Sequence, residues 1–479
     1  MSLLIRNVRI VDGRGREPYK ADLLVQKDKI SAIGNLRSKQ AVSSIDGLGN
    51  FLVPGFIDPG AVPDRYLDLL MNPEQAQLKG EGVTTVIGGN GGVSLAPLIY
   101  GRLEALAKLS GGISVNTNWH LFSEMLKSLS RLRLGVNFGS LAGYETIRSA
   151  IAGEELRELT KNEQRVALKV IERALRDGAF GVSLSSTNTR MPKAEAKGII
   201  SQVNHHRGVI SVSLNAKEGE EEALKAILSF SEKGREKVLV TDFFPTIGYE
   251  DVFEKVLASA PKNVRFALKP FPTVLKTPYD MLPEWVWDGR GADEVAKSLA
   301  EPEVAERAAD ELAWIRPEEA ILSYSGRHSY LEGKSVSELG ELFELPPAKA
   351  LIKVFSMCKL RCGILYSAAN PEVLRKHLAD ENVFASTYGH SKLSRLTAER
   401  GERNHFSEYL RAATESGQTL PEAVKRITSA PAKFFNLENR GTILEGNFAD
   451  LVLIDKDNFR AIETVVGGIA GGHVLYHRG

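Results

Sequence analysis

Polar and charged side chains stand at or just beyond the carboxyl ends of several short apolar runs that are typical of β-strands. These residues are of types that serve as acids, bases or ligands: Asp58, Asn90, Tyr144, Asn215, Lys217, Asp242, Lys269 and His390. The carboxyl ends of parallel strands gather at one mouth of a barrel, which is where barrel enzymes place their chemistry. The sequence therefore predicts a candidate site at such a mouth.

Asp242 is central to three alternative interpretations of this site. With Lys217 or Lys269 it forms a buried ion pair, which compensates a charge that burial would otherwise leave alone. The same residues also suit a general acid–base pair, so Asp242, Lys217 and Lys269 are weak catalytic candidates. In the third interpretation Asp58, Asp242 and His390 hold a metal, but their spacing matches no familiar ligand set.

Eight apolar, β-branched runs supply the strands that position these residues. They are Val53–Asp58, Thr84–Gly89, Leu134–Ala142, Gly181–Ser186, Val209–Asn215, Val238–Phe244, Val264–Lys269 and Val383–Tyr388. Helical patterns lie between them, and one begins at a capping box of Thr160 and Glu163. Another helix is predicted at about 219–233. Alternating strands and helices predict a parallel sheet, and eight strands most simply close into a (β/α)8 TIM barrel.

Both ends of the chain carry short strand patterns punctuated by turns. Because isolated pairs of strands are marginally stable, residues 1–52 and 435–479 are predicted to combine in one small β-sandwich domain. The barrel then occupies residues 53–434. Residues from about 272 to 345 break the alternation with two tryptophans and a charged helical run, Asp293–Leu312. We expect an α-rich insertion there, between the seventh and eighth strands and over the barrel mouth.

Composition excludes several classes of protein. Of the 479 residues, 61 are Lys or Arg and 60 are Asp or Glu, so the charge balance favours neither nucleic acid nor an anionic membrane as a partner. No apolar run approaches the roughly 20 residues of a membrane span. Cys358 and Cys362 are the only cysteines, too few for a disulfide framework, and two reduced thiols are expected. A cytoplasmic location follows as an expectation.

Two motifs resemble the amidohydrolase superfamily and its N-acyl-D-amino-acid deacylase (D-aminoacylase) branch. The first is the Val-Pro-Gly-Phe-Ile-Asp-Pro-Gly-Ala-Val stretch at 53–62, which in that superfamily leads into a His-x-His pair. The second is the Glu-Gly-Val-Thr-Thr-Val-Ile-Gly-Gly-Asn-Gly-Gly stretch at 81–92, where the deacylases have Asn-Cys-Gly. The resemblance covers nearly the whole chain. It implies a TIM barrel beside a β-domain built from both termini, zinc as cofactor, and hydrolysis of C–N bonds other than peptide bonds.

This chain departs from the family at the positions that the resemblance assigns to chemistry. The metal-binding positions fall on Gly60, Val62, Gly91, Leu214 and Asp242, of which only Asp242 can bind a metal. The position at Leu214 moves to Ser213 if the register slips by one residue. Thr387 stands where the family has its general-base aspartate. Zinc usually takes three or four protein donors. We therefore predict no metal at these degenerate positions, and an Asp242–lysine pair in the vacated space.

The resemblance leaves three functions open. The first is a non-hydrolytic pseudoenzyme with a small ligand at the barrel mouth, where Asp58, Asn90, Tyr144, Asn215, Arg327, Thr387 and His390 are candidate pocket residues. Arg327 suits a ligand carboxylate, and a solvated loop is its alternative. The second function is an active amide hydrolase of N-acyl amino acids with an altered site. The third is an assembly role as a homo-oligomer, for which the superfamily has metal-free members as precedent.

Overall fold

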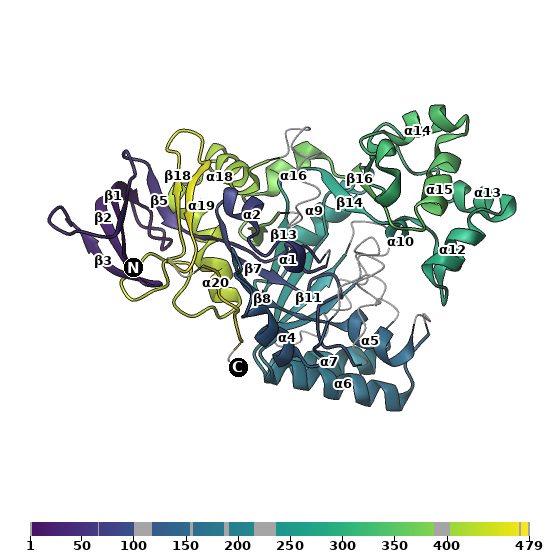
Figure 1. The fold of residues 1–479 in the computed structure, drawn as a ribbon, viewed down its shortest axis with the longest axis horizontal. Coiled ribbons are helices and arrows are strands. Elements are labelled where there is room, and N and C mark those ends of the chain that lie inside the picture. Colours follow the sequence, from purple (N-terminus) through teal and green to yellow (C-terminus); the bar gives the residue numbers. More distant parts are fainter. Residues whose placement is uncertain are drawn as a thin grey trace.

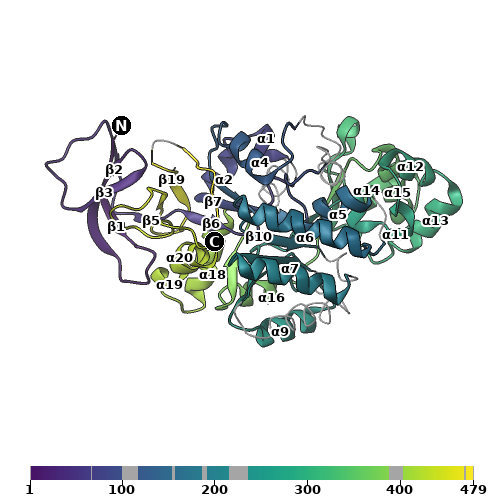
Figure 2. The same ribbon diagram turned by 90° about the horizontal axis from the view of Figure 1, so that it is seen from below.

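Three parts follow one another along the longest axis of the protein, as Figures 1 and 2 show. A β-domain lies at one end, a strand-and-helix barrel in the middle, and a helical region at the other end. The computed structural model describes residues 2–65, 67–99, 117–153, 157–185, 191–214, 236–387, 403–468 and 471–477. The predicted helix at 219–233 lies outside these residues.

All eight predicted barrel strands are present, and they pair in parallel in chain order. The third strand is divided at Leu141 into two segments, which pair with the second and fourth strands respectively. The strands are β6 (Phe56–Asp58), β7 (Val83–Gly88), β8 (Asn137–Ser140), β9 (Ala142–Gly143), β10 (Gly181–Leu184), β11 (Val209–Ser213), β12 (Lys237–Thr241), β13 (Val264–Leu268) and β17 (Val383–Ala385). The TIM-barrel prediction is confirmed.

Helices pack around these strands and bury the main core between the two layers. They are α1 (Asp68–Met71), α2 (Ala76–Gly80), α4 (Phe122–Leu129), α5 (Tyr144–Ala152), α6 (Lys161–Arg176), α7 (Lys193–His205), α9 (Glu250–Ser259), α16 (Pro371–His377), α18 (His405–Glu415), α19 (Leu420–Ile427) and α20 (Ser429–Phe434). Helix α6 begins at the predicted capping box, in which the Glu163 backbone N–H donates to Thr160 Oγ1 at 3.3 Å. It buries Ala167, Ile171 and Leu175 at helical spacing.

Both ends of the chain form one seven-stranded sheet. Its strands are β1 (Ser2–Ile10), β2 (Tyr19–Gln26), β3 (Lys29–Gly34), β4 (Ser43–Asp46), β5 (Phe51–Pro54), β18 (Leu451–Ile454) and β19 (Ala461–Val465). Strand β18 from the carboxyl-terminal end pairs antiparallel with β5, which runs directly into barrel strand β6. The two termini therefore form a common β-domain, and its central strand β5 continues into the barrel.

The inserted region lies between β13 and β17 and has its own core, which includes Leu322, Leu351 and Phe355. Its elements are β14 (Thr273–Lys276), α10 (Pro278–Met281), α11 (Glu284–Trp287), α12 (Ala292–Ser298), α13 (Pro302–Asp310), β15 (Ala320–Tyr324), the 3₁₀ helix η2 (Gly326–Leu331), α14 (Val336–Phe343), α15 (Pro347–Met357) and β16 (Gly363–Ser367). The inserted region extends beyond its expected end near residue 345. Strand β16 pairs with both β14 and β15 and completes an antiparallel sheet that reaches Ser367.

Within the described ranges, no helix combines the length and apolar character that crossing a bilayer requires.

Candidate functional site

Asp242 and Lys269 meet at the carboxyl ends of β12 and β13. Lys269 Nζ lies 3.6 Å from Asp242 Oδ1, and Ser213 Oγ donates to Asp242 Oδ2 at 2.7 Å. Asp242 has a left-handed backbone, with φ of 58°, which aspartate tolerates better than most residues. Its side chain is about one-third exposed, at 34%. An ion pair therefore occupies the barrel mouth where the fifth, sixth and seventh strands end.

Arg65 adds a second positive charge to this mouth. It follows β6 and lies 3.8 Å from Asp280 of the inserted region. Burial acts to raise the pKa of the Asp242 carboxyl, but the charges of Lys269 and Arg65 and the hydrogen bond from Ser213 outweigh it and lower that pKa. Asp242 is consequently a stable carboxylate held among cations, which is the opposite of a group adjusted to accept a proton near neutral pH.

Asp58 closes the barrel where the first and last strands meet. In the described part of the chain, no backbone ladder joins β6 to β17. The Asp58 carboxylate spans this seam: it accepts from Ser386 Oγ at 2.7 Å, and from Thr387 Oγ1 and the Thr387 backbone N–H at 2.7 and 2.8 Å. The backbone N–H groups of Gly60 and Ala61 donate to Oδ1, the oxygen that also accepts from Ser386, whereas Thr387 donates to Oδ2. Asp58 and Thr387 thus join the first and last strands, and both oxygens of the Asp58 carboxylate accept hydrogen bonds.

Asn90 is buried inside the barrel and bonded on both sides of its amide. Its Nδ2 donates to the carbonyls of Pro59 and Ile87, each at 2.9 Å, and its Oδ1 accepts from Ser211 Oγ at 2.8 Å. The side chain therefore links the loop after β6 to β7 and β11. This arrangement gives Asn90 a packing role within the barrel interior.

Tyr144 and Glu195 form a second buried pair, between the first turns of α5 and α7. The Tyr144 hydroxyl donates to Glu195 Oε1. Both residues are buried, and this burial raises the pKa of Glu195 to about 7. Tyr144, a predicted pocket residue, is therefore engaged with a carboxyl group that holds a proton at mildly acidic pH.

The raised pKa of Glu195 predicts a pH-dependent stability. The folded protein keeps this proton up to about pH 7, whereas the unfolded chain releases it near 4.5. The contribution of Glu195 to the free energy of unfolding is therefore greatest below about pH 4.5 and falls by about 2 to 3 kcal/mol as the pH rises to 7. We expect Glu195→Gln to remove this slope, so that the variant matches the native protein at pH 5 and is more stable at pH 8. Urea midpoints at both pH values measure the difference, and equal native and variant slopes would contradict the assignment.

The degenerate metal positions are filled by other side chains. A Cβ on Gly60 would lie 2.7 Å from Ser386 Oγ and 2.9 Å from Ala267 Cβ. At Gly91, where φ is 68°, a Cβ would lie 3.2 Å from the Arg65 guanidinium. Leu214 is fully buried, and Val62 is half-buried and apolar. Among the described residues no three His, Cys, Asp or Glu side chains are grouped as metal ligands, so the described donors around Asp242 do not make up a zinc site.

Other predicted site residues lie away from this cluster or outside the described chain. Arg327 is exposed on η2 in the inserted region, which corresponds to the solvated-loop alternative. Asn215, Lys217 and His390 fall in segments outside the described residues, so the Lys217 pairing and the metal involving His390 stay predictions. The cavity lined by Asp242, Lys269 and their described neighbours measures only about 20 Å³, close to the volume of one water-sized probe.

Two residues at this mouth escaped the reasoning from sequence. Asp64 and Arg65 lie in a loop, six and seven residues past Asp58, and carry no strand pattern. Asp64 is buried, accepts from the Gly89 backbone N–H at 2.7 Å, and burial raises its pKa to about 6. The only signal was an Asp-Arg dipeptide after Pro63, which is common in solvated turns.

Comparison with known proteins gives one family and a consistent set of relatives. A model described as the amidohydrolase family matches residues 400–476. The chain is 34% identical over 193 residues to an N-acyl-D-aspartate deacylase of Alcaligenes xylosoxydans xylosoxydans, over 40% of this chain and 38% of the relative. An N-acyl-D-glutamate deacylase of the same organism is 24% identical, over 95% of this chain and 88% of its own length. The first of these matches therefore spans about two fifths of that relative.

Solved structures share the whole fold. A zinc- and phosphonate-bound N-acyl-D-glutamate deacylase from Bordetella bronchiseptica superposes with a TM-score of 0.76 at 21% identity, over 99% of both chains. A D-aminoacylase structure gives a TM-score of 0.75 at 21% identity, again over 99% of both chains. At these identities the likeness establishes the fold alone, a barrel with an attached β-domain.

Proposed function

We propose that this chain binds a carboxylate-bearing small molecule without zinc-dependent hydrolysis. Residues 400–476 match the amidohydrolase family, and the fold is that of solved N-acyl-D-glutamate deacylase and D-aminoacylase structures. The observation that carries the proposal is the filling of the metal positions: Arg65 lies against Gly91, and Lys269 pairs with Asp242. Arg65 and Lys269 thus lie beside positions that the resemblance assigns to metal ligands, and a protonated guanidinium or ammonium group has no lone pair to offer a metal. Such cations suit the carboxylate of an N-acyl amino acid.

The energetics of hydrolysis support a non-hydrolytic function. Zinc lowers the pKa of a bound water from about 15.7 to about 7, which amounts to roughly 12 kcal/mol of nucleophile activation. Loss of the general base removes a further factor of about 10² to 10⁴. Thr387, at the general-base position, is buried and donates both its hydroxyl and its backbone N–H to Asp58. A cytoplasmic location belongs to this proposal, supported by the two free thiols Cys358 and Cys362.

Metal content, ligand binding and turnover test the proposal together. We expect well under one zinc per purified chain, no zinc-dependent hydrolysis of N-acetyl-D-amino acids, and saturable binding of those compounds in calorimetry. Arg65→Gln should weaken binding by on the order of tenfold, because one charge-assisted contact is lost. Arg327→Gln, which removes an exposed arginine on η2, is the matched control and should leave binding unchanged. One zinc per chain, or an affinity that Arg65→Gln leaves unchanged, would overturn the proposal.

A second candidate rests on the close approach of Lys269 to Asp242. In this alternative the chain is an altered hydrolase of N-acyl amino acids, with the pair acting as acid and base. It predicts metal-independent turnover that disappears in Asp242→Ala and in Lys217→Ala. The lowered pKa of Asp242 counts against it as a base near neutral pH.

The assembly role, as a homo-oligomer, predicts a defined species in light scattering.

A further inference from the structure

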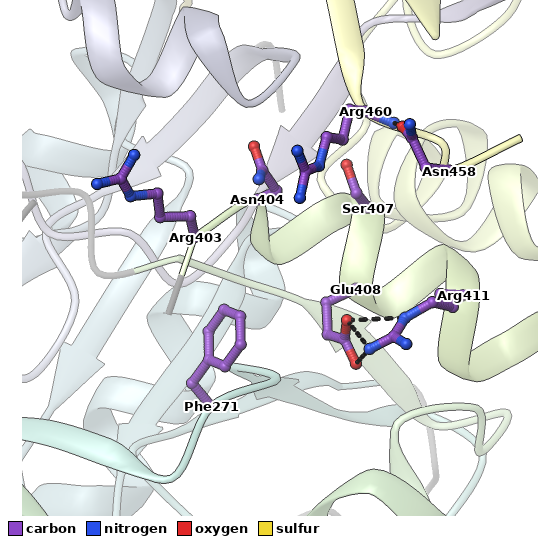
Figure 3. A pocket seen from close by; sticks show the side chains of 8 residues that line it. All are labelled: Phe271, Arg403, Asn404, Ser407, Glu408, Arg411, Asn458 and Arg460. Atoms are coloured by element: carbon purple, nitrogen blue, oxygen red, sulfur yellow. Dashed lines mark hydrogen bonds and ion pairs between the residues drawn. The ribbon is translucent and has the colours of Figure 1, made fainter. Parts of the chain in front are cut away.

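A second cavity lies outside the barrel mouth, between the start of α18, the β18–β19 connection and Phe271. It encloses about 630 Å³, within the range of small-molecule pockets. Seven of its eight lining residues are polar or charged, and the eighth is a phenylalanine. The lining residues are Phe271, Arg403, Asn404, Ser407, Glu408, Arg411, Asn458 and Arg460. Figure 3 shows Arg403 on one side and Arg460 with Asn458 on the other, above the ring of Phe271. The charged groups come from segments far apart in sequence.

The arginines of this cavity differ in how their charges are compensated. Glu408 is bonded to Arg411 through two nitrogens, at 3.0 Å and 2.7 Å, and also accepts from Arg375. Within the described ranges, the guanidinium groups of Arg403 and Arg460 form no ion pair or hydrogen bond; Arg460 donates to Asn458 Oδ1 through its backbone N–H. Two guanidinium groups that line one cavity attract an anion, because each offers a planar fork of donors to a carboxylate or phosphate.

The start of α18 is not the source of this attraction. Glu81 accepts from the His405 backbone N–H at 2.8 Å and from His405 Nδ1 at 2.9 Å, and it compensates the positive end of the helix. An incoming anion would therefore be held by the arginine forks. The amide of Asn404, which lines the same cavity beside Ser407, adds a further polar contact.

Phe271 gives the cavity an apolar wall. Its ring packs edge-on against His405, with centroids 5.0 Å apart, which fixes its orientation. The other side of Phe271 lines the small space beside Asp242 and Lys269. A ligand with a flat or apolar arm can rest on this ring while its oxyanion lies between the arginines.

We propose that this cavity binds a small molecule with an oxyanion head and an apolar arm, the head held by Arg403 and Arg460 and the arm by Phe271. The head is a phosphate or a carboxylate, which make the same contacts with a guanidinium. The site has its own arginines and does not depend on the function proposed at the Arg65 mouth, although Phe271 also lines the space beside Asp242 and Lys269.

Binding of four simple probes tests the proposal on the full chain. The dissociation constants of inorganic phosphate, phenyl phosphate, acetate and benzoate are to be measured by calorimetry at low ionic strength. Phenyl phosphate should bind more tightly than phosphate, or benzoate more tightly than acetate, and the tighter pair identifies the head group. Phe271→Leu should remove the advantage of the phenyl ring and leave binding of the bare anion unchanged.

Arginine variants decide whether the cavity is the site. Arg403→Gln and Arg460→Gln should each weaken binding by on the order of tenfold. Arg37→Gln removes the same charge from an exposed position on the β-domain and should have no effect. N-acetyl-D-amino-acid binding that depends on Arg65 should survive both cavity variants. The proposal is overturned if no probe binds saturably, if the variant that combines Arg403→Gln with Arg460→Gln binds as well as the native chain, or if Arg37→Gln weakens binding equally.

Discussion

Asp58→Ala should destabilise the barrel by about 3 to 5 kcal/mol, because it opens the seam between the first and eighth strands. The native carboxylate accepts five hydrogen bonds from residues on both sides of that seam. Alanine would leave the buried N–H groups of Gly60 and Thr387 and the Ser386 hydroxyl without this acceptor. Burial also raises the pKa of Asp58, so part of the loss is offset by relief of a desolvated carboxylate.

Hydrogen exchange gives the local readout for this prediction. The amides of β6 and β17 should lose protection in Asp58→Ala before those of β12, and the urea midpoint of the whole chain should fall. Thr387→Val removes one of the five donors and should cost about 1 kcal/mol. Asp457→Ala, at an exposed turn, should stay within about 0.5 kcal/mol of the native protein. A loss below about 1 kcal/mol for Asp58→Ala would show that other contacts hold the seam.

The sequence was most informative about the strands, for a physical reason. Val238–Val240, within the predicted strand Val238–Phe244, is continuously apolar because a barrel strand is buried on both faces. Such runs alternate with helical patterns along the chain, which is typical of a parallel sheet. The insertion was harder to delimit. The apolar run Ile321–Tyr324 resembles a returning strand, and only the pairing of β15 with β16 shows that the inserted sheet continues to Ser367.

Side chains at strand ends were harder to assign than the strands. Asn90 and Tyr144 stand at the expected positions, but both are buried and hydrogen-bonded within the scaffold. A position at a strand end does not determine whether a side chain enters solvent or the barrel interior. Arg65 was missed because it lies in a loop and not at a strand end. The direction of that loop depends on long-range contacts such as the one between Arg65 and Asp280. The metal positions that the resemblance assigns stay a prediction, and sequence reasoning did not find Arg65, which lies beside Gly91.

Gly60→His should fail to restore a metal ligand and should destabilise the fold by about 3 kcal/mol or more. Gly60 does not need glycine for its backbone, because its φ is not positive; the restriction is steric. Even a Cβ would meet Ser386 Oγ at 2.7 Å and Ala267 Cβ at 2.9 Å. Overpacking by a few atoms in such a core typically costs about 1 to 3 kcal/mol, and an imidazole adds more. Gly60→Ala should therefore lie within that range, and Val62→His, at a half-buried position, should cost less.

Zinc titration of the Gly60→His, Val62→His double variant separates a steric defect from a lost binding site. A restored site with zinc at about a hundredfold excess over its dissociation constant would stabilise the chain by about 2.7 kcal/mol. We expect no such gain, because Arg65 lies against Gly91 and Lys269 already pairs with Asp242, so the remaining ligand positions offer positive charge. Zinc-dependent recovery of the thermal midpoint would show that the mouth still accommodates a metal centre. Its absence, with Val62→His alone near native stability, would indicate that the mouth has been rebuilt around side-chain cations.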